Sequence, residues 1–170
     1  MENKLNITYW KWLFHGVDGS KPGISQYCDR WLIFHIIVAS ILCYSIPVDA
    51  DMAKSLVIPF VSILIAITVA WCGNITSLLN TEEIIELSTY HPLGIEAYAF
   101  TVQNAVLVLF ITIIVWVIYG FSILNNSLGK FLVFFMSSVA IRDSWNLILL
   151  AQQLTITRIK ILLHKKNTRR

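Results

Sequence analysis

The sequence predicts an all-α membrane protein with four transmembrane helices, and three observations support this fold class. Hydrophobic residues make up 56% of the 170-residue chain and charged residues only 14%, whereas soluble domains carry about 25% charged residues. The apolar residues gather in four runs, each near the length that crosses a bilayer. The segments between these runs are short, so we expect residues 1–170 to form a single transmembrane domain.

Residues 1–30 precede the first apolar run and are predicted to lie at the membrane interface. They mix lysines with aromatic side chains such as Tyr9, Trp10 and Trp12, and this mixture is typical of segments in the lipid headgroup region. No apolar stretch follows closely on a basic one here, so the segment does not resemble a cleaved secretory signal. We therefore expect an interfacial segment that stays attached to the first span.

The first two predicted spans cover about residues 31–48 and 55–77. The connection between them is only a few residues long, so the two helices should be antiparallel neighbours. Pro59 is expected in the first turn of the second helix, where its missing N–H costs little.

The third predicted span covers about residues 105–124, after the longest internal connection. A short helix over Glu82–Ser88 is expected inside this connection. The third helix can begin as early as Pro92, because proline is favoured at the first helical position. A helix of that length exceeds the hydrocarbon core, so its N-terminal part should extend into the cytoplasm.

The fourth predicted span covers about residues 131–151, and residues 152–170 form a basic tail. No helix breaker occurs between Phe131 and Asn167, so the fourth helix should also extend into the cytoplasm. An even number of spans places both termini on one side, which then holds ten lysines and arginines against Lys54 and Lys130 opposite. The excess of basic residues predicts that both termini are cytoplasmic.

The fourth span carries two ionisable residues near its centre, Arg142 and Asp143. Each costs about 2.5–3.5 kcal/mol at the middle of a transmembrane helix, so neither should face lipid. At 100° per residue, the polar residues of this helix fall on one side. The predicted intramembrane polar site consists of Ser138, Arg142, Asp143, Asn146 and Gln153.

Three interpretations of this polar site follow from the sequence. It can be a hydrogen-bond or ion-pair network that locks the helix to its neighbours, or a ring of Arg142 side chains that lines a pore in an oligomer. It can also reflect a displaced span boundary, with Arg142 at the interface. The first three spans contain no acidic residue, so Asp143 of a neighbouring copy is a candidate partner for Arg142 and would hold a homo-oligomer together.

Two clusters of opposite charge are predicted on the cytoplasmic side. The acidic residues are Glu82, Glu83, Glu86 and Glu96, and the basic residues are Arg158, Lys160, Lys165 and Lys166. The basic tail can act as a topology signal in contact with anionic membrane lipids. Alternatively, it pairs with the acidic connection or docks a soluble cytoplasmic partner. We expect no nucleic-acid binding.

Motifs of catalysis are lacking in the sequence. His35 and His91 stand apart from one another, the cysteines form no CxxC pair, and no glycine-rich phosphate loop occurs. We therefore expect a protein that is not an enzyme and that has no metal site and no cofactor.

In layout the chain resembles small bacterial four-span proteins of phage exclusion, phage defence and bacteriocin immunity. The shared features are four spans, tight outer loops, a polar inner loop and a basic tail. The resemblance implies an accessory or effector protein of the bacterial inner membrane.

The first functional hypothesis is a small oligomeric effector or sensor that gates or perturbs the membrane, including by ion conduction past Arg142. The alternative is a membrane anchor subunit that recruits a soluble cytoplasmic partner through its charged helix extensions.

Overall fold

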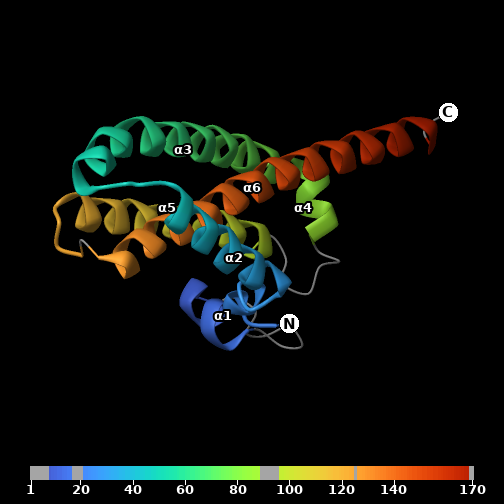
Figure 1. The fold of residues 1–170 in the computed structure, drawn as a ribbon. Coiled ribbons are helices and arrows are strands. Elements are labelled where there is room, and N and C mark those ends of the chain that lie inside the picture. Colours follow the sequence, from blue (N-terminus) through green and yellow to red (C-terminus); the bar gives the residue numbers. More distant parts are fainter. Residues whose placement is uncertain (1–7, 17–20, 89–95, 125, 169–170) are drawn as a thin grey trace.

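The chain is helical throughout the part that the computed structural model describes, which comprises residues 8–16, 21–88, 96–124 and 126–168. No strand occurs in these residues. The elements in chain order are α1 (Tyr9–His15), the short 3-10 helix η2 (Gly23–Gln26), α2 (Arg30–Ser45), α3 (Ala50–Leu79), α4 (Glu82–Ser88), α5 (Glu96–Gly120) and α6 (Ser127–Thr168) (Figure 1). The all-α prediction is therefore confirmed, as is the short helix over Glu82–Ser88.

Three helices, α3, α5 and α6, are long and apolar enough to cross a membrane. The apolar helix α2 has 16 residues, or about 24 Å of helix, against a hydrocarbon core of about 30 Å. It is shorter than the predicted span 31–48 because it ends at Ser45. The next residue, Ile46, precedes Pro47, and the residue before a proline is disfavoured in the helical conformation. Three of the four predicted spans are thus helices long enough to cross a bilayer.

The longest helix, α6, is the centre of the fold. It runs without a break for 42 residues, and α2, α3 and α5 all pack against it. In Figure 1 its C-terminal end projects beyond the other helices. The predicted continuation of this helix beyond residue 151 is therefore confirmed. The third helix also begins ahead of its predicted span, at Glu96, and the still earlier start predicted at Pro92 lies outside the described residues. The helix ends at Gly120, before a turn in which Ser122 has a positive φ of 61°.

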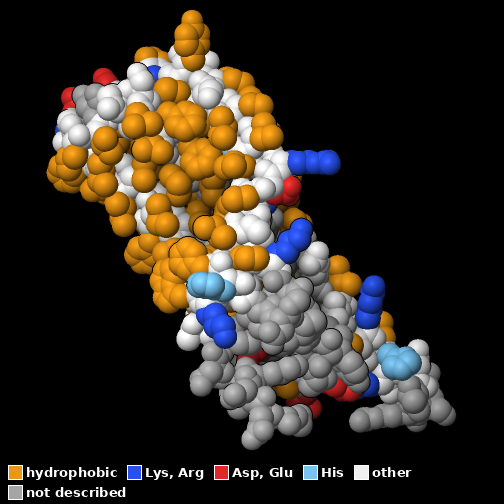
Figure 2. Space-filling model, turned by 90° about the horizontal axis from the view of Figure 1, so that it is seen from below, with side chains coloured by type: hydrophobic (Ala, Val, Ile, Leu, Met, Phe, Trp, Pro, Cys, Tyr) orange, Lys and Arg blue, Asp and Glu red, His pale blue; other side chains and the backbone are white. Residues whose placement is uncertain are grey.

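The hydrophobic core lies between α3, α5 and α6. Ala53 packs near Val133 at one end of the core, and Ile75 packs near Leu147 at the other end. The two helices α3 and α6 therefore run in the same direction, and α5 runs opposite to both. Figure 2 shows hydrophobic side chains covering the broad end of one face, whereas basic, acidic and histidine side chains gather toward the narrow end.

The helices α2 and α3 diverge from their shared turn. Each packs on α6, but no packing between the two occurs in the described residues. The expectation that they would be packed neighbours is therefore wrong, although their directions are antiparallel. The physical reason is that α2 is held on α6 by its own polar contacts, including a 2.6 Å hydrogen bond between His35 and Ser138.

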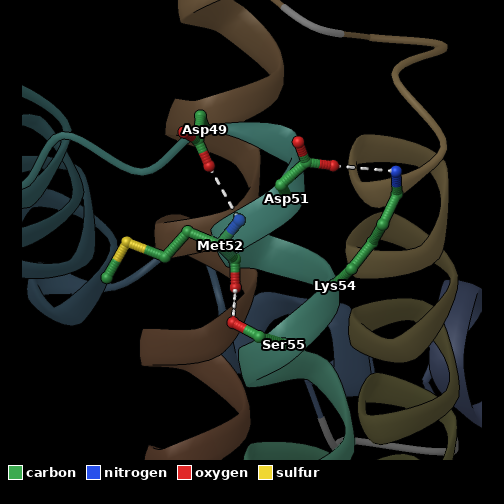
Figure 3. A network of polar contacts seen from close by, with 5 residues as sticks. All are labelled: Asp49, Asp51, Met52, Lys54 and Ser55. Atoms are coloured by element: carbon green, nitrogen blue, oxygen red, sulfur yellow. Dashed lines mark hydrogen bonds and ion pairs between the residues drawn. The ribbon is translucent and has the colours of Figure 1, made fainter.

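The start of α3 is fixed by a capping carboxylate. Asp49 accepts a hydrogen bond of 2.7 Å from the backbone N–H of Met52 (Figure 3), which satisfies one of the free N–H groups of the first turn. The nearby ion pair between Asp51 and Lys54 spans 3.1 Å and is exposed, so it contributes at most about 1 kcal/mol. Because α3 begins at Ala50, Pro59 lies inside the helix and not in its first turn, which corrects the prediction.

The N-terminal helix α1 lies against the start of α5. Trp12 and Leu13 are buried beside Phe100, while Trp10 and Phe14 are exposed. A Cβ atom at Gly23 would lie 2.6 Å from the Trp12 ring, so only glycine allows η2 to approach α1 this closely. One apolar face is thus buried and one is presented outward, as an interfacial segment requires.

Candidate functional site

The candidate site lies where α6 passes the N-terminal end of α2. Its buried centre is Asp143, whose carboxylate accepts a hydrogen bond of 2.6 Å from the hydroxyl of Tyr27. The side-chain amide of Asn104 donates to the same Tyr27 oxygen. The hydroxyl of Tyr9 donates in turn to the Asn104 carbonyl oxygen at 3.2 Å. These four side chains join α1, the segment after η2, α5 and α6.

The direction of the Tyr27 hydrogen bond follows from its protonation. Burial, and then the negative charge of Asp143, raises the pKa of Tyr27 far above its ordinary value. The phenol therefore keeps its proton at neutral pH and donates it to the carboxylate. A buried carboxylate with a strong donor is a stable arrangement, because charge-assisted hydrogen bonds offset the cost of removing the charge from water.

Arg142 lies near one end of α2. Its Nη2 donates to the carbonyl oxygen of Gln26 at 3.3 Å, and its Cζ lies 5.4 Å from the centroid of the Trp31 ring, within the range of a cation–π contact. Both contacts come from the end of the segment predicted to be interfacial and from the start of α2, which is the arrangement expected if Arg142 lies near the membrane interface.

The residues of the predicted intramembrane polar site do not share one set of partners. Ser138 bonds to His35, Arg142 to the backbone before α2, and Asp143 to Tyr27. Asn146 and Gln153 are exposed and form no hydrogen bond with a described residue. The structure therefore brings three of the five predicted residues into one region, though not into one network.

The position of Asp143 disfavours an ion pair between copies. Its side chain is buried and bonded to Tyr27 of its own chain. Tyr27 and Asn104 were missed by the sequence analysis, although a lone asparagine next to a long apolar run was a signal that a partner was needed. Tyr27 gave no comparable signal, because it lies 116 residues from Asp143 in the sequence.

An apolar groove opens beside Arg142, between the diverging helices α2 and α3. Its volume is about 780 Å³, and α6 lines it between those helices. Nearly all of its accessible lining is apolar, although His35, Ser138 and Arg142 are among the residues that border it. The groove is thus of the size and character of sites for hydrophobic ligands.

Beyond the groove, α6 continues as an arm, defined here as residues 152–167, and α4 lies beside it (Figure 1). Ion pairs join Arg158 to Glu83 at 3.5 Å and Lys165 to Glu86 at 2.8 Å. Ile84, between the two glutamates, is fully buried in the core. The acidic and basic clusters are therefore brought together within one chain.

The remaining predicted residues of the two charged clusters lie outside these pairs. Lys160 and Lys166 are exposed on the arm, and Glu82 and Glu96 are exposed at the starts of α4 and α5. Lys160 and Lys166 thus form no ion pair with a described residue, beside Arg158 and Lys165, which α4 engages. In the described residues no group of three histidine, cysteine or acidic side chains is placed to hold a metal ion.

Fold and site together define an all-helical protein with three helices able to cross a membrane by length and composition. Comparison of the chain with models of known families, with curated proteins and with solved structures finds no match.

Proposed function

We propose that the chain is a small, homo-oligomeric, multi-pass membrane protein that acts as an effector or sensor and gates or perturbs the bilayer. In this proposal α3, α5 and α6 cross the membrane, α2 forms the fourth span, and the N-terminal segment lies at the interface. The distribution of lysine and arginine supports cytoplasmic termini. The bacterial inner membrane, and a role in phage defence, exclusion or immunity, rest on the layout described above.

The observation that supports a homo-oligomer is an exposed stripe along one face of the arm, called the seam here. It consists of the polar residue Gln152 and the apolar residues Ile156, Ile159 and Leu163. The three apolar members are 53%, 51% and 57% exposed. Their spacing alternates between four and three residues, the period with which helices pair in a coiled coil. Toward the membrane, Leu149 and Trp145 continue the seam on the same face.

The seam is free to meet a second copy because α4 packs elsewhere. At 100° per residue, Arg158 and Lys165 lie on the opposite side of α6 from Ile156 and Leu163, and their ion pairs hold α4 there. The arm holds only about two heptads, which pair weakly when isolated. Membrane anchoring supports pairing, because it keeps the arms parallel, on one side and at high local concentration.

The continuity of α6 supports the sensor or effector role. One unbroken helix carries the seam and the α4 ion pairs at one end, and Arg142 at the border of the groove nearer the other. A cytoplasmic event that changes how the arms pair would therefore rotate or shift the helix face that borders the groove.

The oligomer is tested by placing a charge in the seam. Ile159→Lys should shift the detergent-solubilised protein to a smaller species, because a buried lysine would lie at the helix contact. Leu162→Lys is the matched control, since Leu162 is an exposed arm residue outside the seam. Light scattering after gel filtration gives the masses. Equal masses for the wild type and both variants would contradict pairing through the seam.

The effector role is tested by ion flux with the same proteins in liposomes. The wild type and Leu162→Lys should release a trapped ion, whereas Ile159→Lys should release it several-fold more slowly. Arg142→Leu should alter the rate. Tight liposomes for the wild type and Leu162→Lys, with their oligomers intact, would exclude ion conduction.

The alternative function, an anchor that recruits a soluble cytoplasmic partner, is favoured by the exposed basic residues of the arm. Lys160 and Lys166 are not used by α4 in the ion pairs described above. Affinity capture with Lys160→Glu and Lys166→Glu combined should then lose a partner that the wild type retains. Retention of every captured protein would count against recruitment.

A further inference from the structure

The groove is apolar along its length, and the end that Arg142 borders is called its polar end here. Trp31, Arg142 and Trp145 lie at the polar end, and Leu42 and Leu56 lie toward the turn between α2 and α3. From Trp31 to Leu42 the α2 wall measures about 16 Å. This length is about half of a 30 Å hydrocarbon core, and so corresponds to one leaflet of a bilayer.

The polar end contains buried groups without partners. His35 is 3% exposed, and its Nε2 has no hydrogen bond with a described residue. The same holds for Nη1 of Arg142, which is buried, and both residues line the groove. Unpaired buried polar atoms are costly, so a ligand that offers oxygen acceptors at this point is favoured. A guanidinium binds phosphate oxygens particularly well.

We propose that the groove binds an anionic phospholipid, with its phosphate on Arg142 and one acyl chain along the groove. The apolar walls then contact the chain, and the Arg142 guanidinium, whose buried Nη1 has no partner among the described residues, reorients toward the groove to donate to the phosphate. In the orientation proposed above, the polar end lies at the cytoplasmic leaflet, whose surface is negatively charged. The inference rests on insertion into a bilayer, and not on oligomerisation or ion conduction.

A second copy of the chain is a poorer occupant of the groove, because it has no suitable acidic residue among those described. Asp143 is buried against Tyr27, Asp29 and Asp49 cap helices, and Asp51 pairs with Lys54. The described glutamates belong to α4 and to the first turn of α5. A lipid phosphate supplies the negative charge that the chain itself does not bring to the groove.

The proposal is tested by native mass spectrometry of the full chain in detergent, titrated with phosphatidylglycerol or phosphatidylcholine of identical acyl chains. The wild type should bind phosphatidylglycerol about tenfold more tightly, since Arg142 forms a charge-assisted contact without a competing headgroup cation. Arg142→Gln should remove this preference, whereas Lys160→Gln, which removes a basic residue of the same helix outside the groove, should retain it. Equal affinity of the wild type for both lipids, or an unchanged preference in Arg142→Gln, would overturn the proposal.

A second pair of variants tests the acyl-chain part without touching Arg142. Ile63 lines the groove and Leu128 does not, and both side chains are 59% exposed. Ile63→Trp should weaken phosphatidylglycerol binding several-fold by filling the groove, and Leu128→Trp should not. Equal binding by these two variants would refute the location.

Two further measurements separate the sources of failure. Glycerol phosphate, the headgroup without acyl chains, should not displace the lipid; displacement at equal concentration would show a site for free phosphate and overturn the lipid assignment. Flotation of the wild type with phosphatidylcholine vesicles reports insertion alone. Insertion without lipid preference overturns this inference and leaves the proposed function standing, whereas failure to insert overturns both.

Discussion

Tyr27→Phe is expected to lower the free energy of unfolding by about 3 kcal/mol. The lost hydroxyl is both the donor to Asp143 and the acceptor from Asn104. Its removal leaves a buried carboxylate without its donor and a buried amide without its acceptor. Burial of an unpaired charge is among the most destabilising changes that a single substitution makes.

Thermal unfolding in detergent, followed by circular dichroism, measures this loss. Tyr44→Phe is the matched control, because Tyr44 is 94% exposed and should change the unfolding free energy by less than about 0.5 kcal/mol. Adding Asp143→Leu to Tyr27→Phe removes the charge as well and should recover part of the stability. If Tyr27→Phe unfolded like Tyr44→Phe, the network would have no structural importance.

Leu147→Ala is expected to destabilise the fold by about 2–3 kcal/mol. Leu147 is fully buried in the cluster that joins α3, α4, α5 and α6, beside Ile75 and Ile84. Truncation leaves a cavity, so the neighbouring side chains lose dispersion contacts that they cannot regain without moving.

The control for this prediction is Leu128→Ala, on the same helix. Leu128 is exposed and lies outside the seam, so its truncation opens no internal cavity and should cost less than about 0.5 kcal/mol. Both variants are compared by the midpoint of thermal unfolding. Equal midpoints would mean that the cluster around Leu147 is not packed as the structure has it.

Much of the helical fold could be predicted from the sequence, because helix formation depends on local patterns. Four apolar runs placed the long helices, although α2 ended earlier than its run. The absence of a breaker after Phe131 predicted the continuity of α6 into the arm. The charged clusters were likewise evident from residue type alone, and the structure pairs Glu83 with Arg158 and Glu86 with Lys165.

The candidate site was less predictable, because its contacts join residues that are far apart in the chain. The sequence identified Arg142 and Asp143 as unusual within an apolar helix. It could not show that Asp143 would bond to Tyr27 or that Arg142 would reach the backbone at Gln26. It also paired the two ionisable residues with a neighbouring copy, whereas Asp143 is buried within its own chain.

What the sequence by itself determined is therefore the class of fold, the helices and their charge distribution, since apolar periodicity and helix breakers act over a few residues. Only the tertiary structure decided that α2 and α3 diverge over α6 and leave a groove. It alone also decided the partners of Arg142, which are the backbone at Gln26 and the ring of Trp31. Packing of distant segments is a property of the whole chain, and no local pattern encodes it.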